Sequence, residues 1–201
     1  VNRLIKKIKN DEKTDELKIA VLGSYIPLLS NQDIADKLSN YKSKNILFNN
    51  LIDMQINEPL KEKKLVNSIK SLGKISDTVS KKVRNQYEEY PYPRWRCTYS
   101  NTPTNFLNIV NGHIKPNRIQ INHKFNNPNV LIAGCGTGNH ICQAANYLNA
   151  NILGVDLSLS SLAYAKRKVE ELGLKNIEFL QADILQLNNL NKKFDVIECV
   201  G

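Results

Sequence analysis

The stretch from Asn129 to Asn139, NVLIAGCGTGN, decides the fold of this chain. Residues 130–133 are apolar and typical of a buried strand, and three glycines follow at alternate positions, Gly134, Gly136 and Gly138. Because glycine has no Cβ, the backbone can take positive φ at these places and a ligand can lie against it. The stretch therefore predicts a strand, a tight turn at a ligand site, and the start of a helix.

Two further expected strands are each followed by a carboxylate. The apolar run at 152–155 is followed by Asp156, at the spacing expected in a nucleotide-type βαβ unit, and the strand expected at 177–180 is followed by Asp183. In parallel sheets, ligands bind at the carboxyl ends of the strands. We expect Asp156 to accept hydrogen bonds from ribose hydroxyls and Asp183 to accept one from an adenine amino group. Asp183 is also a candidate N-cap of the helix that would follow it.

The alternation of strands and helices predicts the fold class and three parts of the chain. The class is α/β, an incomplete Rossmann-like parallel sheet with four strands present, at 130–133, 151–155, 177–180 and 196–200, preceded by an α-helical region. Helices are expected over 139–148 and from the cap Ser158 to Gly173. The parts are a helical region at 1–89, a proline-containing transition at 90–128, and a truncated Rossmann-like half at 129–201. Helices in the first part are expected over 46–56, over 60–72, and from the cap Ser76 to Tyr87.

Composition excludes several kinds of protein. The chain has 201 residues and a net charge of +9, but its lysines are interleaved with acidic residues, so nucleic-acid binding is not expected. No apolar run is long enough for a membrane span and the N-terminus lacks a signal-peptide core, which predicts a cytoplasmic protein without membrane contact. The four cysteines form no C-x-x-C pair and have no nearby histidine at the spacing of metal ligands, which predicts reduced, mostly buried thiols and no metal site. The chain lacks an initiator Met and ends within an apolar run, so we expect an inactive fragment.

The glycine pattern differs from two common nucleotide-binding motifs. A dinucleotide fingerprint is G-x-G-x-x-G, whereas counting from Gly134 the third position falls on Asn139. No Gly-Lys-Ser/Thr follows, which excludes a phosphate-binding P-loop. A nicotinamide-dependent oxidoreductase is therefore disfavoured, although Asp156 and Asp183 would also serve it.

Four motifs together carry a family resemblance: VLIAGCGTG at 130–138, GVDLS at 154–158, QADI at 181–184 and FDVIECVG at 194–201. In this order they resemble the class I S-adenosylmethionine-dependent methyltransferases. The resemblance implies a methyltransferase with S-adenosyl-L-methionine as cofactor, and it implies that the glycine turn wraps the methionine and ribose parts. The cofactor-binding residues predicted on this basis are Gly134, Cys135, Gly136, Gly138, Asp156, Leu157, Asp183, Ile184, Val200 and Tyr87.

Two features qualify that resemblance. The family usually has an acidic residue two positions before the first glycine, directed towards the cofactor's amino group, and this chain has Ile132 there. Upstream, NQYEEYPYPRW at 85–95 is similar to a segment that precedes the domain in bacterial methyltransferases with tetratricopeptide repeats. This similarity implies that residues 12–75 are the tail of a helical repeat array. The aromatic residues of 87–95 would either pack the helical region onto the sheet or cover the cofactor, with Tyr87 or Tyr92 near the glycine turn.

The methyl acceptor and the catalytic residues stay open. The acceptor could be a small molecule or a protein, and the helical region could bind a protein partner. Cys135 is expected to fill the turn because no base accompanies it, and His140 to face solvent or cap the following helix. A third alternative is a non-catalytic helical interaction module attached to a degenerate domain.

Overall fold

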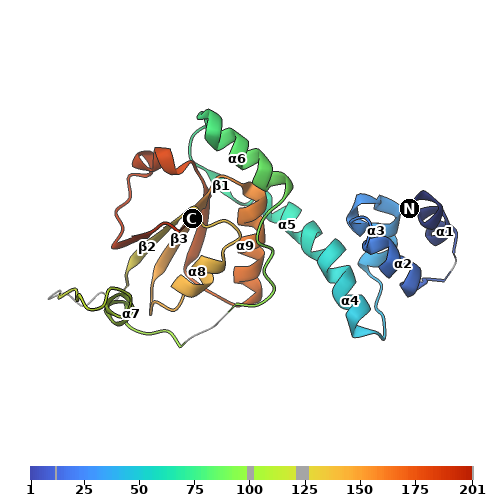
Figure 1. Cartoon of the computed structure of the whole chain (residues 1–201), viewed down its shortest axis with the longest axis horizontal. Coiled ribbons are helices and arrows are strands. Elements are labelled where there is room, and N and C mark those ends of the chain that lie inside the picture. Colours follow the sequence, from blue (N-terminus) through green and yellow to red (C-terminus); the bar gives the residue numbers. More distant parts are fainter. Residues whose placement is uncertain (12, 99–101, 121–126, 201) are drawn as a thin grey trace. The chain divides into compact units, whose positions relative to one another are not determined.

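The computed structural model describes residues 1–11, 13–98, 102–120 and 127–200 (Figure 1). The chain divides into two compact units, Val1–Lys63 and Lys64–Gly201. The boundary between the units falls within the helix Glu58–Val66, whereas the helical region predicted from the sequence extends to residue 89. Across the described ranges, no helix is both long and apolar enough to cross a bilayer.

Among the described residues of the first unit, all the regular elements are helices. Its elements are α1 (Asn2–Asn10), α2 (Glu16–Gly23), η1 (Leu28–Ser30), α3 (Gln32–Ser39), α4 (Ile46–Ile52), η2 (Asp53–Asn57) and the start of α5 (Glu58–Val66). Asp15, Asn31 and Asn45 cap α2, α3 and α4 by accepting hydrogen bonds from backbone N–H groups. α4, η2 and α5 follow one another without a break. The π-helical turn η2 ends two residues before Pro59, whose missing N–H interrupts the helical hydrogen bonds.

The second unit contains a parallel sheet with the strand order β1-β4-β3-β2-β5. Its strands are β1 (Lys70–Ser71), β2 (Asn129–Ala133), β3 (Asn151–Asp156), β4 (Ile177–Gln181) and β5 (Val196–Glu198). The predicted α/β class and its four strands are confirmed. The fifth strand, β1, was missed: the expected helix over 60–72 ends at Val66, and Lys70 and Ser71 pair with Leu180 and Gln181 at the edge of the sheet.

The helices of this unit are α6 (Thr78–Glu89), α7 (Phe106–His113), α8 (Asn139–Ala144), α9 (Leu159–Glu171) and the 3₁₀ helix η3 (Ile184–Leu190). α6 packs against α9 (Figure 1). Ser158 caps α9 as expected, and Gly173 follows its end with positive φ. The cap of α6 is Asp77 and not Ser76, because the Asp77 carboxylate accepts from Ser80 N. α8 ends four residues earlier than the expected Leu148.

The central strands β2 and β3 are buried on both faces, as is usual in parallel sheets. Val130 and Ile132 of β2 lie in one apolar cluster with Ile141 of α8 and Leu162 of α9. The alternate residues, Leu131 and Ala133, lie in a second cluster on the other face. The strand ends that carry the predicted site residues therefore emerge at one edge, between two covered faces.

Candidate functional site

The glycine turn joins β2 to α8 and has positive φ at all three glycines, +73° at Gly134, +51° at Gly136 and +83° at Gly138. Gly134 N and Cys135 N both donate to Val155 O, at 2.8 and 2.9 Å, which fastens the turn to β3. A Cβ at Gly134 or Gly136 would meet nothing within 4 Å, whereas one at Gly138 would lie 2.6 Å from the Ala165 Cβ of α9. The first two glycines leave open space for a ligand, and the third lets α9 approach the turn.

Asp156 ends β3 and holds this turn in place. Its Oδ2 accepts from Gly136 N at 2.8 Å and its Oδ1 from Ser158 N at 2.9 Å. Because each carboxylate oxygen can accept two hydrogen bonds, both oxygens retain a position for ligand hydroxyls. Burial raises the pKa of Asp156, and the nearby charge of Glu88 adds to the rise, while the backbone hydrogen bonds oppose it.

Asp183 follows β4 and is only 1% exposed. Its Oδ1 accepts from Leu185 N at 3.0 Å, so it is the N-cap of η3. Its Oδ2 is buried and has no hydrogen-bond partner within the described parts of the chain. A buried acceptor without a donor is unfavourable, and an amino group of a ligand would satisfy it. Asp183 is therefore able to cap the helix and to receive a ligand at the same time.

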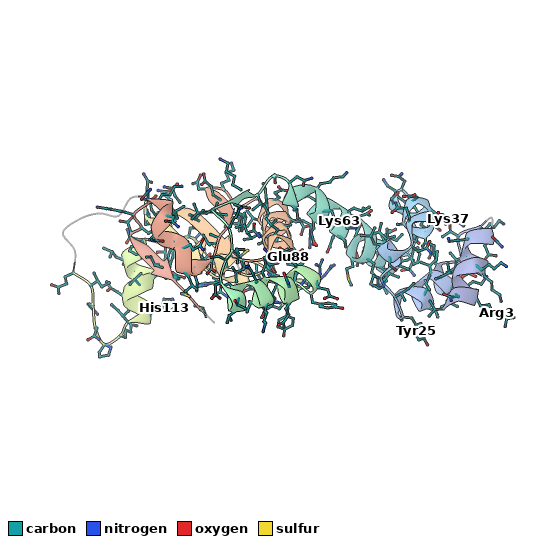
Figure 2. The ribbon with its side chains drawn as sticks, turned by 90° about the horizontal axis from the view of Figure 1, so that it is seen from above. Arg3, Tyr25, Lys37, Lys63, Glu88 and His113 are labelled. Carbon is teal, nitrogen blue, oxygen red and sulfur yellow. The ribbon has the colours of Figure 1, made fainter. Side chains whose placement is uncertain are left out.

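Glu88, near the end of α6, lies between α6 and α9 (Figure 2). Its carboxylate accepts from Leu159 N at 2.7 Å, Ser160 N at 3.0 Å and Ser160 Oγ at 2.7 Å. The N-terminus of a helix is stabilised by a negative charge. Glu88 supplies that charge at the N-terminus of α9, which begins three residues after Asp156. No local pattern in the sequence distinguishes Glu88 from the neighbouring Glu89, so this role was not predicted.

The aromatic segment reaches the glycine turn through Trp95. Trp95 Nε1 donates to Thr137 O at 2.9 Å, and Thr137 Oγ1 donates to Pro93 O at 2.6 Å. The Trp95 ring also packs edge-on against Tyr164 of α9, with the ring centroids 6.0 Å apart. Tyr92 is 73% exposed and Tyr87 is half-buried. The segment thus packs the turn against α9, while the predicted cofactor contact of Tyr87 stays a prediction.

A second cluster of ionisable groups lies at the end of β5. Glu198 Oε2 is 2.5 Å from His140 Nε2, and Glu198 Oε1 accepts a hydrogen bond from Tyr147 Oη. Burial raises the pKa of Glu198, but the hydrogen bonds from His140 and Tyr147 outweigh it, so this pKa lies below its ordinary value. His140 does not cap its helix, because the N-cap of α8 is Gly138 and no side chain caps it. Its side chain is partly exposed and pairs with Glu198, a contact that the sequence did not predict. The one signal in the sequence was the charged Glu198 within the apolar run 196–200.

The remaining predicted site residues are placed as follows. Leu157 O accepts from Gln181 Nε2 at 2.9 Å, while Ile184 and Val200 are exposed. Cys135 is buried, and burial raises the pKa of its thiol, which suits a space-filling residue better than a nucleophile. Cys142 is also buried, but Cys97 and Cys199 are exposed, so the thiols are not mostly buried as expected. No group of three or more His, Cys, Asp or Glu side chains suitable for a metal ion occurs among the described residues.

The site residues follow one another along the carboxyl edge of the sheet in strand order. Asp183 follows β4, Asp156 ends β3, the glycine turn follows β2, and Glu198 ends β5. Since neighbouring strands are about 4.8 Å apart, this row is about 14 Å long. It offers acceptors at Asp183 and Asp156 and an open turn beside them. These residues fit a nucleoside with an extended side arm, such as S-adenosyl-L-methionine.

Parts of the chain are similar in sequence to known proteins, several of which are named as methyltransferases. Residues 124–200 match the family model of a methyltransferase domain. An uncharacterized protein of Rickettsia prowazekii, RP789, is 35% identical over 139 residues, which cover 69% of this chain and 24% of that protein. A tRNA (guanine-N(7)-)-methyltransferase of Rubrobacter xylanophilus is 49% identical over 61 residues, 30% of this chain and 27% of that enzyme. The structure of PKMT2 from Rickettsia typhi in complex with AdoHcy is 34% identical, covers 36% of this chain and 14% of that one, and has a TM-score of 0.33.

The family match includes all four motifs of the resemblance, short of Gly201, and supports a class I methyltransferase. These comparisons give no support to a nicotinamide-dependent oxidoreductase. The chain spans only about a quarter of the length of the first two relatives.

Proposed function

We propose that residues 64–200 form the cofactor-binding part of an S-adenosyl-L-methionine-dependent methyltransferase. The observation that carries the proposal is the row of Asp183, Asp156 and the glycine turn on three adjacent strands. These groups suit the adenine, the ribose and the side arm in the order in which the cofactor joins them.

The bound cofactor would supply an electrophilic methyl group on a sulfonium. In this proposal, Asp156 accepts hydrogen bonds from the ribose hydroxyls, and the unpartnered Oδ2 of Asp183 accepts one from the adenine amino group. Gly134 and Gly136 let the backbone lie against the side arm. Methyl transfer is a displacement that depends mainly on proximity and orientation, so holding the cofactor in this way is the chief contribution of these residues.

The matched segments do not identify the methyl acceptor. The Rubrobacter relative is named for a tRNA guanine, while a relative from Papaver bracteatum, 33% identical over 73 residues, is named as a probable (S)-tetrahydroprotoberberine N-methyltransferase. Both match this chain over short segments although their named acceptors differ. This supports a shared cofactor-binding role, and a small-molecule or protein acceptor for this chain stays a prediction.

We also propose that the chain is of the type found with tetratricopeptide repeats. Two observations support this: the regular elements described in the unit Val1–Lys63 are all helices, and the segment 85–95 packs on the glycine turn through Trp95. A protein partner of the helical unit would follow from that type.

Calorimetry on the full-length protein tests the function. We expect S-adenosylhomocysteine to bind and NAD not to bind. Asp156→Ala should weaken the binding of S-adenosylhomocysteine by about 1.5–3 kcal/mol, the range for hydrogen bonds to a charged group. Asp195→Ala is the matched control. The Asp195 carboxylate accepts a hydrogen bond from Asn129 N at the N-terminal ends of β2 and β5, away from the strand ends that carry the site. Binding of NAD without any response to either sulfur-containing ligand would overturn the proposal.

A further inference from the structure

The proposed cofactor carries an ammonium group at the end of its side arm, and the glycine turn provides no charge for it. The last residues of β2 before the turn are Ile132 and Ala133, and Ile132 is 1% exposed in the apolar cluster. Of the carboxylates at this edge, Asp183 and Asp156 lie beside β4 and β3, and Glu88 is engaged by the N-terminal amides of α9. On the other side of the turn lies Glu198.

The register of the sheet places Glu198 beside position 132. In the parallel pair of β2 and β5, Ile132 is the partner of Glu198, and Val130 is the partner of Val196. Val130, Ile132 and Val196 all pack in the same cluster, and side chains two residues apart on a strand share a face. The Glu198 side chain therefore lies on the same face of the sheet as Ile132, on the neighbouring strand β5.

The surroundings of Glu198 keep it charged and oriented. Its side chain is 19% exposed and that of His140 27% exposed, so the pair is half-buried yet open to a ligand. The pKa of Glu198 is lowered by its two hydrogen-bond donors, against the opposing effect of burial, which keeps the carboxylate ionised at neutral pH. His140 lies two residues after Gly138, in the first turn of α8, so the pair adjoins the glycine turn. Each Glu198 oxygen still has an acceptor position.

We propose that Glu198, oriented by His140 and Tyr147, binds the ammonium group of the cofactor's amino-acid part, and so replaces an acid at position 132. The inference rests on the proposed function. It completes the row: Asp183 for adenine, Asp156 for ribose, the glycine turn for the thioether and Glu198 for the terminal ammonium.

Two ligands that differ in this one part test the assignment. S-adenosylhomocysteine has the amino-acid part, while 5′-methylthioadenosine keeps the nucleoside and thioether but lacks it. In calorimetry on the full-length protein, Glu198→Gln should weaken S-adenosylhomocysteine by about 10- to 100-fold, as expected for a lost hydrogen bond to a charged group. The same variant should bind 5′-methylthioadenosine within about twofold of the parent, which also shows that it is folded. Equal weakening of both ligands, or of neither, would overturn the proposal.

Further variants serve as control and as a second test. Glu178→Gln changes an exposed carboxylate of β4, 3.8 Å from Lys192, and should alter neither affinity. Tyr147→Phe keeps the ring against Phe106 but removes one donor to Glu198, and should weaken S-adenosylhomocysteine severalfold while sparing 5′-methylthioadenosine. A parent that binds neither ligand would contradict the proposed function itself. A parent that binds both, with variants that do not discriminate, would contradict only the role of Glu198.

Discussion

The three glycines of the turn have two different tasks. Gly134 and Gly136 border open space, whereas Gly138 lies against Ala165 of α9. All three have positive φ, a backbone conformation that residues with a Cβ adopt only at an energetic cost. The first two therefore stay the predicted positions for ligand binding, and the third lets α9 approach the turn.

Gly138→Ala should destabilise the protein by about 1–3 kcal/mol, because the added methyl would lie 2.6 Å from the Ala165 Cβ and the residue would be held at positive φ. Chemical denaturation measures the loss. Gly112→Ala is the control: it is an exposed glycine of α7 with nothing within 4 Å of an added Cβ. The control should be neutral or up to about 1 kcal/mol more stable, since alanine favours helix. Equal effects of the two substitutions would show that the contact with α9 does not matter.

The two roles predicted for Asp183, helix N-cap and ligand acceptor, are compatible with each other. The cap and the ligand acceptor were alternatives in the sequence, but they use different oxygens, Oδ1 for Leu185 N and Oδ2 for a ligand. The predicted N-cap is confirmed, and the contact with adenine stays a prediction.

At the scale of elements, Glu88 joins α6 to the start of α9. Glu88→Gln should raise the hydrogen-exchange rates of the Leu159 and Ser160 amides and lower the free energy of unfolding by about 1–2 kcal/mol, because a charged acceptor at a helix N-terminus is replaced by a neutral one. Hydrogen exchange followed by mass spectrometry or NMR measures the change. Glu89→Gln alters the exposed neighbour and should leave both amides unaffected. If Glu88→Gln leaves the hydrogen-exchange rates of these two amides unchanged, the proposed role of Glu88 is wrong.

The pairing of β5 with α8 through Glu198 should make stability depend on pH. The pKa of Glu198 in the folded protein lies below its ordinary value of 4.5, so the folded state binds fewer protons than the unfolded state. The stabilisation is present above about pH 4.5 and is lost as the pH falls through the folded pKa. Denaturation between about pH 6 and pH 3 should therefore show a shallower acid loss for Glu198→Gln than for the parent. Glu178→Gln should keep the parental slope, and identical slopes for all three proteins would refute the expectation.

At the scale of the whole molecule, every residue of the candidate site comes from the unit Lys64–Gly201. A chain that starts at Glu58, and so keeps all of α5, should bind S-adenosylhomocysteine within about twofold of the full-length protein, because no site residue is removed. Calorimetry on both chains measures this. A loss of more than tenfold in a folded, shortened chain would show that the helical unit contributes to the site.

The sequence by itself determined the sheet strands β2 to β5, the glycine turn, and the caps Ser158 and Asp183. These features depend on local rules: apolar runs, the freedom of glycine, and side chains that bond amides two or three residues away. Only the tertiary structure decided β1, the capping of α9 by Glu88, and the pairing of Glu198 with His140 and Tyr147. Their partners are far apart in the sequence, with Glu88 and Leu159 separated by 71 residues. Such contacts arise when the sheet and its helices assemble, and no local pattern encodes them.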